Sequence, residues 1–513
     1  MEQETTPDAT PFPLDHLTKR GAPAAPALVL REEVLTYGML EERVGRMASW
    51  LAGQAVANAR IATWARKGEL TCLMPLAAAR AGMVHVPVNP LLKRAQVAHI
   101  LADSGAELLL ADEARLSTLE DGDVPGGCRA MDAADALPAM TAAANALPPS
   151  SHDPEALAAI LYTSGSTGLP KGVILSHRNL WLGAVAVAHY LALAADDVTL
   201  AVLPLSFDYG QNQLLSTWYA GGSVVPLDYL TPRDVVKACD RHKVTTLAAV
   251  PPLWTQLAET VWPQEAVRSL RRLTNSGGAL TRPLIAAMRR TFSGVDIVPM
   301  YGLTEAFRST YLPPHLVDDH PTSIGTDIPF AEVLVVNDAG KAAAIGEEGE
   351  LVHCGPLVAQ GYWGDAGRTA ERFRPAPRWS RYGGMAAWSG DRVRRDADGL
   401  LYFHGRRDAM IKSLGNRISP DEIEAAALES LLVVEAVAIG VPDARLGQAI
   451  HLAVRGAAGR APEAEALQAH LARQLPGFMQ PQVIHWMEQL PRGPNGKIDR
   501  QRLLSELTAE IQP

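Results

Sequence analysis

The 513-residue chain is poor in cysteine, with four: Cys72, Cys128, Cys239 and Cys354. No two of them have the spacing of a Cys-x-x-Cys pair, which argues against a zinc or redox site of that type. So few cysteines cannot cross-link a chain of this length, so a disulfide-stabilised scaffold is excluded. We therefore expect a protein of the reducing cytoplasm.

Long hydrophobic runs and basic tracts are lacking as well. The most apolar stretch, residues 180–195, includes His189 and is shorter than the roughly 18 residues that span a bilayer, so we expect a buried helix and no membrane span. Lysine and arginine total 47 against 56 aspartates and glutamates, a net charge of −9. This balance argues against a nucleic-acid partner bound by bulk attraction. The first residues, M-E-Q-E-T-T-P-D, are unlike a signal peptide.

The chain does have the composition of a globular protein, since 47% hydrophobic residues are enough for a large core. Its length suggests about three domain-sized units. Residues 1–13 read as a loose arm. From residue 28 to residue 90, apolar segments alternate with helical patterns (helix 39–55, strand 61–64, helix 70–81), which favours an α/β fold with buried parallel strands.

The pattern changes along the rest of the chain. Residues 133–154 are rich in Ala, Pro and Ser and predict a surface connection. Residues 331–363 combine short strands with glycine turns and predict a small antiparallel or barrel-like unit. A further change after residue 405 places a domain boundary at 407–408. The other expected elements are strands 158–162, 198–203, 222–226, 245–250, 297–300 and 433–439, and helices 420–431 and 462–475.

Residues 162–172, Y-T-S-G-S-T-G-L-P-K-G, form a glycine-rich, hydroxyl-lined loop that ends in a lysine. Backbone N–H groups of such a loop can bind phosphate oxygens. A Walker A loop is excluded, because Pro170 precedes Lys171 and Gly172 follows it. Residues 173–175 read as a strand, so the loop is expected to join two strands. Composition alone leaves a flexible hairpin tip as an equal alternative.

Four further segments, given at the end of this paragraph, follow the glycine-rich loop in order. Together with the loop they resemble five motifs of the AMP-forming adenylating superfamily, which comprises acyl-CoA synthetases, adenylation domains of nonribosomal peptide synthesis and luciferases. The similarity spans roughly residues 30–505. Within the superfamily, S-F-D-Y-G-Q-N-Q and Y-G-L-T-E-A-F-R-S-T-Y-L-P-P look most like the ligases found beside exosortase systems, where a carrier protein is an expected acceptor. The four further segments are M-Y-G-L-T-E-A at 300–306, W-S-G-D-R at 388–392, G-R-R-D-A-M-I-K-S-L-G-N-R-I-S-P-D-E-I-E at 405–424 and P-R-G-P-N-G-K-I-D-R at 491–500.

The resemblance implies both a fold and a reaction. The fold is α/β: a large N-terminal domain, 14–407, of two βα sheets with a small β-barrel-like subdomain, then a small mobile α+β C-terminal domain, 408–513. The reaction is attack of a carboxylate on the α-phosphorus of ATP, with Mg²⁺, to give an acyl- or aminoacyl-adenylate and pyrophosphate. A pantetheine thiol, of CoA or of an acyl or peptidyl carrier protein, then displaces AMP. Both reactants of the first step are anions, so the site has to supply positive charge.

The resemblance also implies roles around the nucleotide. The glycine-rich loop would hold the β- and γ-phosphates, Thr304 would donate to the α-phosphate, and Glu305 would bind Mg²⁺. Tyr301 would stack on adenine and Asp391 would accept hydrogen bonds from the ribose. Taken alone, Asp391 is a turn residue and the Thr-Glu pair a helix start. The predicted ATP site is Thr163, Ser164, Gly165, Ser166, Thr167, Gly168, Lys171, Gly277, Gly278, Tyr301, Gly302, Asp391 and Arg406.

Lys497 matches the superfamily lysine that bridges the carboxylate and the α-phosphate while the adenylate forms. Taken alone, a lysine in this Gly/Pro/Asn loop is solvated surface. Asp408 occupies the hinge position of the superfamily. Rotation about it would carry the lysine away and bring Lys412 and its neighbours in for the thiol step, with Gly415 leaving room for a pantetheine arm.

The acid pocket departs from that of ordinary acyl-CoA synthetases, which often have a histidine where Phe207 stands. Asp208 beside it resembles the F-D of amino-acid-activating domains, where the aspartate pairs with the substrate's ammonium. Arg308 could meet a second carboxylate, or form a surface or inter-domain salt bridge. We hypothesise a small polar or amino-acid-like substrate; an ordinary fatty or aryl acid ligase and a non-catalytic ATP-binding protein are the alternatives. The predicted pocket is Phe207, Asp208, Asn212, Ser276, Met300 and Arg308.

Overall fold

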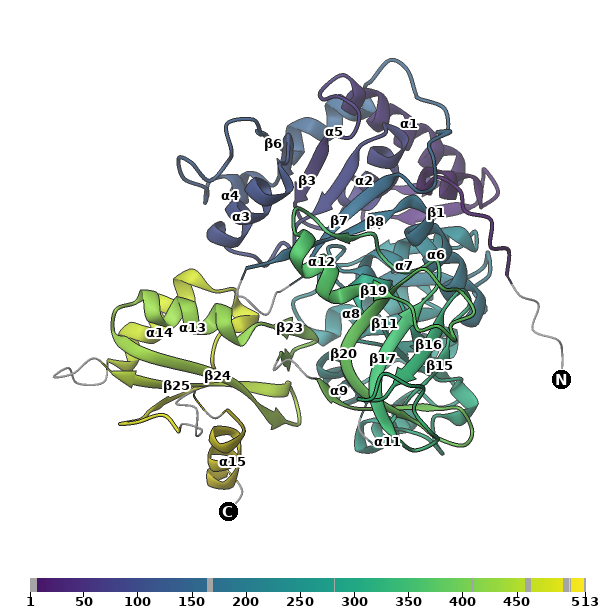
Figure 1. Ribbon diagram of the computed structural model, residues 1–513. Helices are drawn as coiled ribbons and strands as arrows, with labels where there is room; N and C mark the ends of the chain where they lie inside the picture. Colours follow the sequence, from purple (N-terminus) through teal and green to yellow (C-terminus); the bar gives the residue numbers. More distant parts are fainter. Residues whose placement is uncertain are drawn as a thin grey trace.

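The computed structural model of the protein describes residues 7–163, 169–280, 282–406, 410–456, 463–491, 498 and 500–511. A large N-terminal domain, coloured from purple to green in Figure 1, carries a smaller C-terminal domain, in yellow-green, at its side. The large domain contains two sheets flanked by helices. The predicted α/β class is confirmed.

The first sheet is parallel over β3, β4, β5, β6 and β7, and β3 and β4 lie within residues 28–90, for which buried parallel strands were predicted. Strand β8 turns back antiparallel to β7, and β18 arrives from a distant part of the chain to pair with β8. In spatial order the strands are β18 Gly361–Tyr362, β8 Lys171–Ser176, β7 Leu157–Thr163, β4 Val84–Pro87, β3 Arg60–Trp64, β5 Leu108–Ala111 and β6 Arg129–Asp132. Its helices are α1 Tyr37–Ala52, α2 Glu69–Arg80, α3 Arg94–Ser104, α4 Glu113–Leu116 and α5 Ala133–Thr141.

Local sequence explains where these elements begin and which face they bury. Helix α1 starts after Thr36, whose hydroxyl accepts a hydrogen bond from the N–H of Met39 at 3.3 Å. Its buried side chains, among them Leu40, Val44 and Met47, recur every three or four residues and so form one apolar stripe. The stripe belongs to the main core, under the sheet.

The second sheet has 14 strands and two different halves. Strands β1, β10, β9, β11, β12 and β13 are parallel, whereas β14, β15, β21, β20, β17 and β16 continue the same path as antiparallel strands. Residues 331–363 were predicted to form a small antiparallel or barrel-like unit; β16 and β17 of this range lie in the antiparallel half, whereas β18 joins the first sheet. The strands are β1 Pro26–Val29, β2 Val34–Thr36, β9 Val198–Ala201, β10 Ser223–Pro226, β11 Thr246–Ala249, β12 Arg272–Asn275, β13 Asp296–Tyr301, β14 Thr310–Tyr311, β15 Ser323–Asp327, β16 Glu332–Val336, β17 Glu348–Cys354, β19 Phe373–Pro375, β20 Met385–Arg395 and β21 Leu401–Arg406.

Helices cover the parallel half of this sheet, and α12 lies beside β18, β19 and β20 (Figure 1). Helix α6 is buried along most of its length, which confirms the buried helix predicted from residue 180 for its part up to residue 190. No helix in the described ranges is long and apolar enough to cross a membrane. The helices are η1 Leu14–Lys19, α6 His177–Tyr190, α7 Asp208–Tyr219, α8 Pro232–His242, α9 Pro251–Ala258, α10 Gln264–Ser269, α11 Arg282–Thr291, η2 Thr304–Ala306, η3 Pro314–Leu316 and α12 Ala366–Arg372.

The C-terminal domain is a five-stranded sheet with helices on both faces. Along β24, Val437 and Ile439 pack toward α15, whereas Ala436 and Ala438 belong to the core under α13 and α14. This period of two is that of a strand buried on both sides. The elements are β22 Ile411–Ser413, β23 Asn416–Ile418, α13 Pro420–Glu429, β24 Val433–Asp443, β25 Gly447–Gly456, α14 Ala464–Gln474, η4 Gly477–Met479, β26 Val483–Trp486 and α15 Arg500–Ile511.

One expected connection is in part a helix. Within residues 133–154, α5 occupies Ala133–Thr141, and Asp132 caps it by accepting a hydrogen bond from the N–H of Ala134 at 2.9 Å. Ala136 and Met140 of this helix are buried in the main core, so the Ala- and Pro-rich composition was misleading there. The predicted boundary at 407–408, with the hinge residue Asp408, lies outside the described residues.

Candidate active site

A cavity of about 440 Å³ lies where the parallel strands of the second sheet end. Residues just beyond β9, β11, β12 and β13 line it, including Ser206, Val250, Gly277 and Gly302. Ligands of parallel α/β sheets bind at this carboxyl-terminal edge, because strand-end loops from different parts of the chain meet there. The C-terminal domain closes one side of the cavity, so the site contains side chains of both domains.

The turn after β13 carries the residues predicted for the chemistry. Phe307 has φ 57° and ψ −66°, and the N–H of Arg308 donates to the carbonyl of Ala306 at 2.6 Å, which makes a γ-turn. This strained turn sends neighbouring side chains in opposite directions. Phe307 is buried against Gly183 of α6, where an added Cβ would lie 2.2 Å from its ring, and Arg308 faces the cavity.

Glu305 lies at the centre of a charged cluster. Its Oε1 accepts a hydrogen bond from the hydroxyl of Tyr362 at 2.5 Å and lies 3.4 Å from Lys171 Nζ and 3.8 Å from Arg372 Nε. Lys171 also donates to the Tyr362 hydroxyl at 2.7 Å. Burial, with the negative charge of Glu305 adding to it, holds the pKa of Tyr362 above its ordinary value, so this hydroxyl keeps its proton.

Tyr362 and Arg372 were not predicted from the sequence. Tyr362 reaches the site because β18 pairs with β8, which places it opposite Val173, two residues from Lys171. Arg372 ends α12, where its Nη1 also donates to the carbonyl of Trp388 at 3.0 Å. Neither residue stands in a local pattern that indicates a site, because the contacts depend on which strands pair.

The predicted acid pocket divides into two parts. Phe207, Asp208, Ser276 and Arg308 line the 440 Å³ cavity. Asn212 and Met300 instead line a second cavity of about 20 Å³, and Arg308 also lines it. The guanidinium therefore stands between the two cavities, and the smaller one is too small for an acid.

Asp208 begins α7 and interacts with the γ-turn segment on the far side of the cavity. Its Oδ1 accepts a hydrogen bond from the Thr304 hydroxyl at 3.3 Å, and its Oδ2 lies 3.7 Å from Nη2 of Arg308. Nη1 of Arg308 donates to the Ser276 hydroxyl at 2.8 Å, and the face of the Tyr209 ring lies 4.8 Å from the guanidinium carbon. The salt bridge considered for Arg308 from the sequence was at the surface or between domains. The ion pair that the structure shows is instead with Asp208, inside the site.

Tyr301 and Asp391, predicted for the nucleoside end, lie together but outside the lining of the main cavity. The hydroxyl of Tyr301 donates a hydrogen bond to Asp391, and the strand residue paired with Asp391 is Arg406. Gly278 likewise lies outside the lining, and its carbonyl accepts from the side chain of Asn275 at 2.9 Å. Tyr301 is buried beside Phe403, with ring centroids 6.4 Å apart.

The glycine-rich loop lies between two antiparallel strands, as predicted. Thr163, the last residue of β7, pairs with Lys171, the first of β8, and both line the cavity. A Walker loop would instead lead into a helix. Ser164, Gly165, Ser166, Thr167 and Gly168 lie outside the described residues, as does Lys497.

A hairpin tip of the C-terminal domain enters the site. Leu414 and Gly415, with φ 52° and 75°, form the two-residue turn between β22 and β23. A Cβ on Gly415 would lie 2.6 Å from Val250, and one on Gly277 would lie 3.3 Å from the Gly415 carbonyl. Lys412, on the strand before the tip, places its Nζ 4.0 Å from the centroid of the Phe403 ring.

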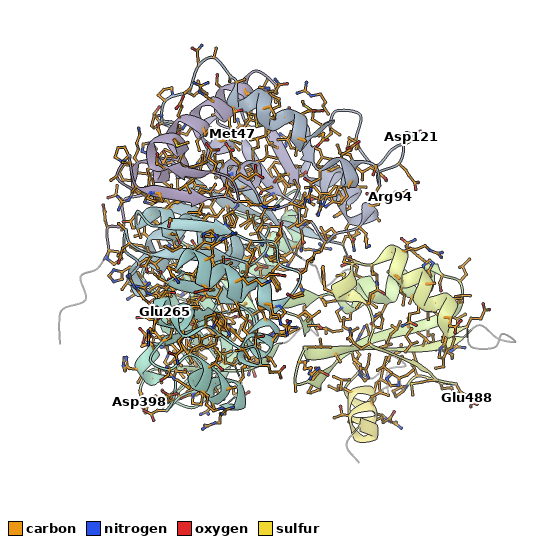
Figure 2. The ribbon with its side chains drawn as sticks, turned by 180° about the vertical axis from the view of Figure 1, so that it is seen from behind. Met47, Arg94, Asp121, Glu265, Asp398 and Glu488 are labelled. Carbon is orange, nitrogen blue, oxygen red and sulfur yellow. The ribbon has the colours of Figure 1, made fainter. Side chains whose placement is uncertain are left out.

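Glu422 makes a second contact between the domains. Its carboxyl, in the first turn of α13, accepts a hydrogen bond from the side-chain amide of Gln96 in α3 at 2.8 Å, and it lines the cavity. Figure 2 labels Arg94, the first residue of α3, on the side of the large domain that faces the C-terminal domain. Burial raises the pKa of Glu422 to about 7, and the hydrogen bond from Gln96 opposes the shift.

The side chains present fit a magnesium nucleotide. Lys171 and Arg372 supply positive charge and Thr304 a hydroxyl donor, which is the donor set that a polyphosphate needs. Within the described residues, no three His, Cys, Asp or Glu side chains are grouped closely enough to hold a metal ion. One carboxylate suffices for Mg²⁺ when phosphates supply further ligands, and Glu305 is the residue that would hold the ion. The bound ion would neutralise phosphate charge as the adenylate forms.

Comparison with known proteins places these features in a family. The family model described as AMP-binding enzyme matches residues 17–363, and the model described as AMP-binding enzyme C-terminal domain matches residues 422–497. The chain is similar to a sulfoacetate–CoA ligase of Cupriavidus necator, with 34% identity over 92% of each chain. It is also similar to a linear gramicidin synthase of Brevibacillus parabrevis, with 30% identity over 93% of this chain and 9% of that one.

A solved structure agrees with this assignment over nearly the whole chain. It is o-succinylbenzoate CoA synthetase of Bacillus subtilis, a double mutant bound with a product analogue, with a TM-score of 0.85 and 26% identity over 97% of this chain and 98% of that one. The fold, the ordered motifs and the family models therefore lead to one conclusion: the chain belongs to the AMP-binding enzymes, the AMP-forming adenylating superfamily.

Proposed function

We propose that the protein is an ATP-dependent acid–thiol ligase that activates a small polar carboxylic acid as its adenylate and transfers the acyl group to CoA. The observation that carries the proposal is the cavity at the strand ends, which Thr304, Glu305 and Lys171 line together with a second group, Asp208 and Arg308. The first group suits phosphates and the second a polar acid.

The reaction assigns a role to each group. Lys171 and Arg372 offset the negative charge of ATP, and Thr304 donates to the α-phosphate. Glu305 would hold a magnesium ion, which would supply further positive charge. Lys497 bridges carboxylate and phosphate in the first step, in keeping with the superfamily motif. In the second step the acceptor thiol enters beside the hairpin tip at Gly415, which lines the cavity in this arrangement of the domains.

A small polar acid is favoured over an α-amino acid. An ammonium group would need Asp208 as its partner, and Asp208 already lies 3.7 Å from the guanidinium of Arg308. Two cations at one carboxylate would repel each other. A long fatty acid is disfavoured as well, because the buried charge of Arg308 would be left against a hydrocarbon chain.

CoA is the proposed acceptor, and the phosphopantetheine of a carrier protein is the alternative. Both present the same thiol, and the similar chains include both a CoA ligase and a gramicidin synthase. The proposal therefore needs a direct comparison of the two thiols.

Exchange of labelled pyrophosphate into ATP tests the first step over a panel of small polar acids, amino acids, and fatty and aryl acids. We expect exchange with small polar acids, loss of it in Lys497→Ala, and no loss in Lys341→Ala, which removes an exposed lysine. Thioester yield with CoA and with a carrier protein that bears a free phosphopantetheine thiol then compares the acceptors. If no acid supports exchange or AMP release, the chain is a non-catalytic ATP-binding protein and the proposal is wrong.

A further inference from the structure

Arg308 is a buried cation whose hydrogen bonds are incomplete. Its side chain is 2% exposed, and within the described part of the chain its Nε and Nη2 atoms have no hydrogen-bond partner. Asp208 lies 3.7 Å from Nη2, which is an ion-pair distance but longer than a hydrogen bond. Because unmet N–H groups on a buried charge are costly, we expect an acceptor to complete this site.

The neighbours of Arg308 hold its guanidinium in one orientation. Nη1 donates to Ser276 at 2.8 Å, and the Tyr209 ring packs against the guanidinium at 4.8 Å. Behind it, Gly302 allows close backbone packing, since an added Cβ would lie 3.0 Å from the Arg308 Cα. A guanidinium fixed in this way presents a planar set of donors, which suits a carboxylate or another oxyanion.

An acceptor larger than a water molecule has to come from the larger cavity. The smaller cavity of about 20 Å³ has room for about one water molecule. The larger one, of about 440 Å³, can hold a small acid, and Thr304 and Asp208 line it together with Arg308. Since Asp208 contacts both Thr304 and Arg308, the phosphate end and the guanidinium are separated by about one side chain.

We propose that the acid activated by this enzyme is short and carries a second anionic group, a carboxylate or a sulfonate, that binds Arg308 and Ser276. The inference rests on the proposed function and names the substrate class of the same site. The reacting carboxylate lies toward Thr304 and the second anion toward Arg308. Asp208 keeps the guanidinium in place through their ion pair. Its negative charge disfavours a substrate anion that is not bound to Arg308.

Matched pairs of acids test the proposal in the unmodified protein. Malonate is compared with its monoamide, and sulfoacetate with methylsulfonylacetate, which is close in shape and lacks the second charge. Release of AMP and pyrophosphate gives kcat/KM for each acid. We expect the doubly charged acid of at least one pair to be preferred by roughly 10- to 100-fold, as for the loss of a hydrogen bond to a charged group.

Two variants then locate the preference. Arg308→Gln is expected to lower kcat/KM for the doubly charged acid by roughly 10- to 100-fold and to lower it less for the neutral partner, so that the preference disappears. Ser276→Ala should reduce the preference by a smaller factor. It provides a second test of the same site if Arg308→Gln fails to fold. Arg290→Gln removes an exposed arginine and should leave the preference intact.

The outcomes separate this inference from the proposed function. If neutral or α-amino acids are turned over with equal or higher kcat/KM, the protein is still a ligase but the substrate class is wrong. If the preference survives in both Arg308→Gln and Ser276→Ala, the anion binds elsewhere and the assignment of Arg308 is wrong. If no acid at all releases pyrophosphate, the proposed function fails and the inference fails with it.

Discussion

Glu422 predicts that the contact between the two domains depends on pH near neutrality. Its carboxyl is buried at the domain junction, where the amide of Gln96 donates to it at 2.8 Å. Burial raises its pKa from 4.5 to about 7. In a separated arrangement of the domains the carboxyl returns to solvent and to its ordinary pKa.

The sign and size of the effect follow from this difference. Below pH 4.5 the carboxyl is protonated in both arrangements and favours neither. Between pH 4.5 and about 7 the carboxyl ionises in solvent but stays protonated at the junction, so the contact weakens as the pH rises, and above this window it weakens no further. A tenfold change in proton affinity is worth about 1.4 kcal/mol, so the full difference between 4.5 and about 7 is worth about 3–4 kcal/mol, or roughly 300-fold in the equilibrium between the arrangements.

Energy transfer between dyes on the two domains measures this equilibrium. Asp121→Cys and Glu488→Cys, labelled in Figure 2, provide exposed attachment sites, and the four native cysteines are buried. We expect energy transfer to change between about pH 4.5 and pH 7 and to level off above this window, and we expect the change to be absent in Glu422→Gln.

Two controls test whether Glu422 is the group responsible. Glu429→Gln changes an exposed residue of the same helix and should leave the titration unchanged. His99→Gln excludes a histidine on the facing helix, because histidines in general titrate in this range. A titration that persists in Glu422→Gln, or that vanishes in His99→Gln, would refute the assignment.

Three further variants test separate contacts. Tyr362→Phe removes the hydrogen bond to Glu305 and should lower pyrophosphate exchange by roughly tenfold or more, whereas unchanged exchange would show that the bond is dispensable. Gly415→Ala places a Cβ 2.6 Å from a valine and should impair thioester formation more than exchange, while Gly399→Ala, with open space, should impair neither. Gly183→Ala crowds a buried ring and should lower the free energy of unfolding by about 1–3 kcal/mol in urea titration; unaltered stability would mean that the ring relocates.

The sequence predicted the elements whose signals are local. The glycine-rich loop was expected between two strands, and β7 and β8 flank it. Strands 61–64 and 158–162 of the first sheet and the helix at 420–431 were likewise predicted, with ends shifted by a few residues, whereas β5 and β6 were not predicted. Strand β12, R-L-T-N, was missed because so short a mixed segment carries no period of its own.

The rest of the site depends on contacts between distant segments. Tyr362 meets Glu305 across 57 residues, and no spacing rule indicates such a pair. The predicted pocket residues Asn212 and Met300 are placed in a separate cavity because the side chain of Arg308 stands between. The positive φ of Phe307 could not be predicted from the sequence either, because phenylalanine rarely adopts a positive φ.

The γ-turn at Phe307 gives two adjacent positions different freedom to change. Position 307 is held by the packing of helix α6, whereas position 308 rests on a glycine and its side chain ends in the cavity. Exchanging the residue at 308 therefore offers a way to redirect the same scaffold toward other acids without rebuilding its interior.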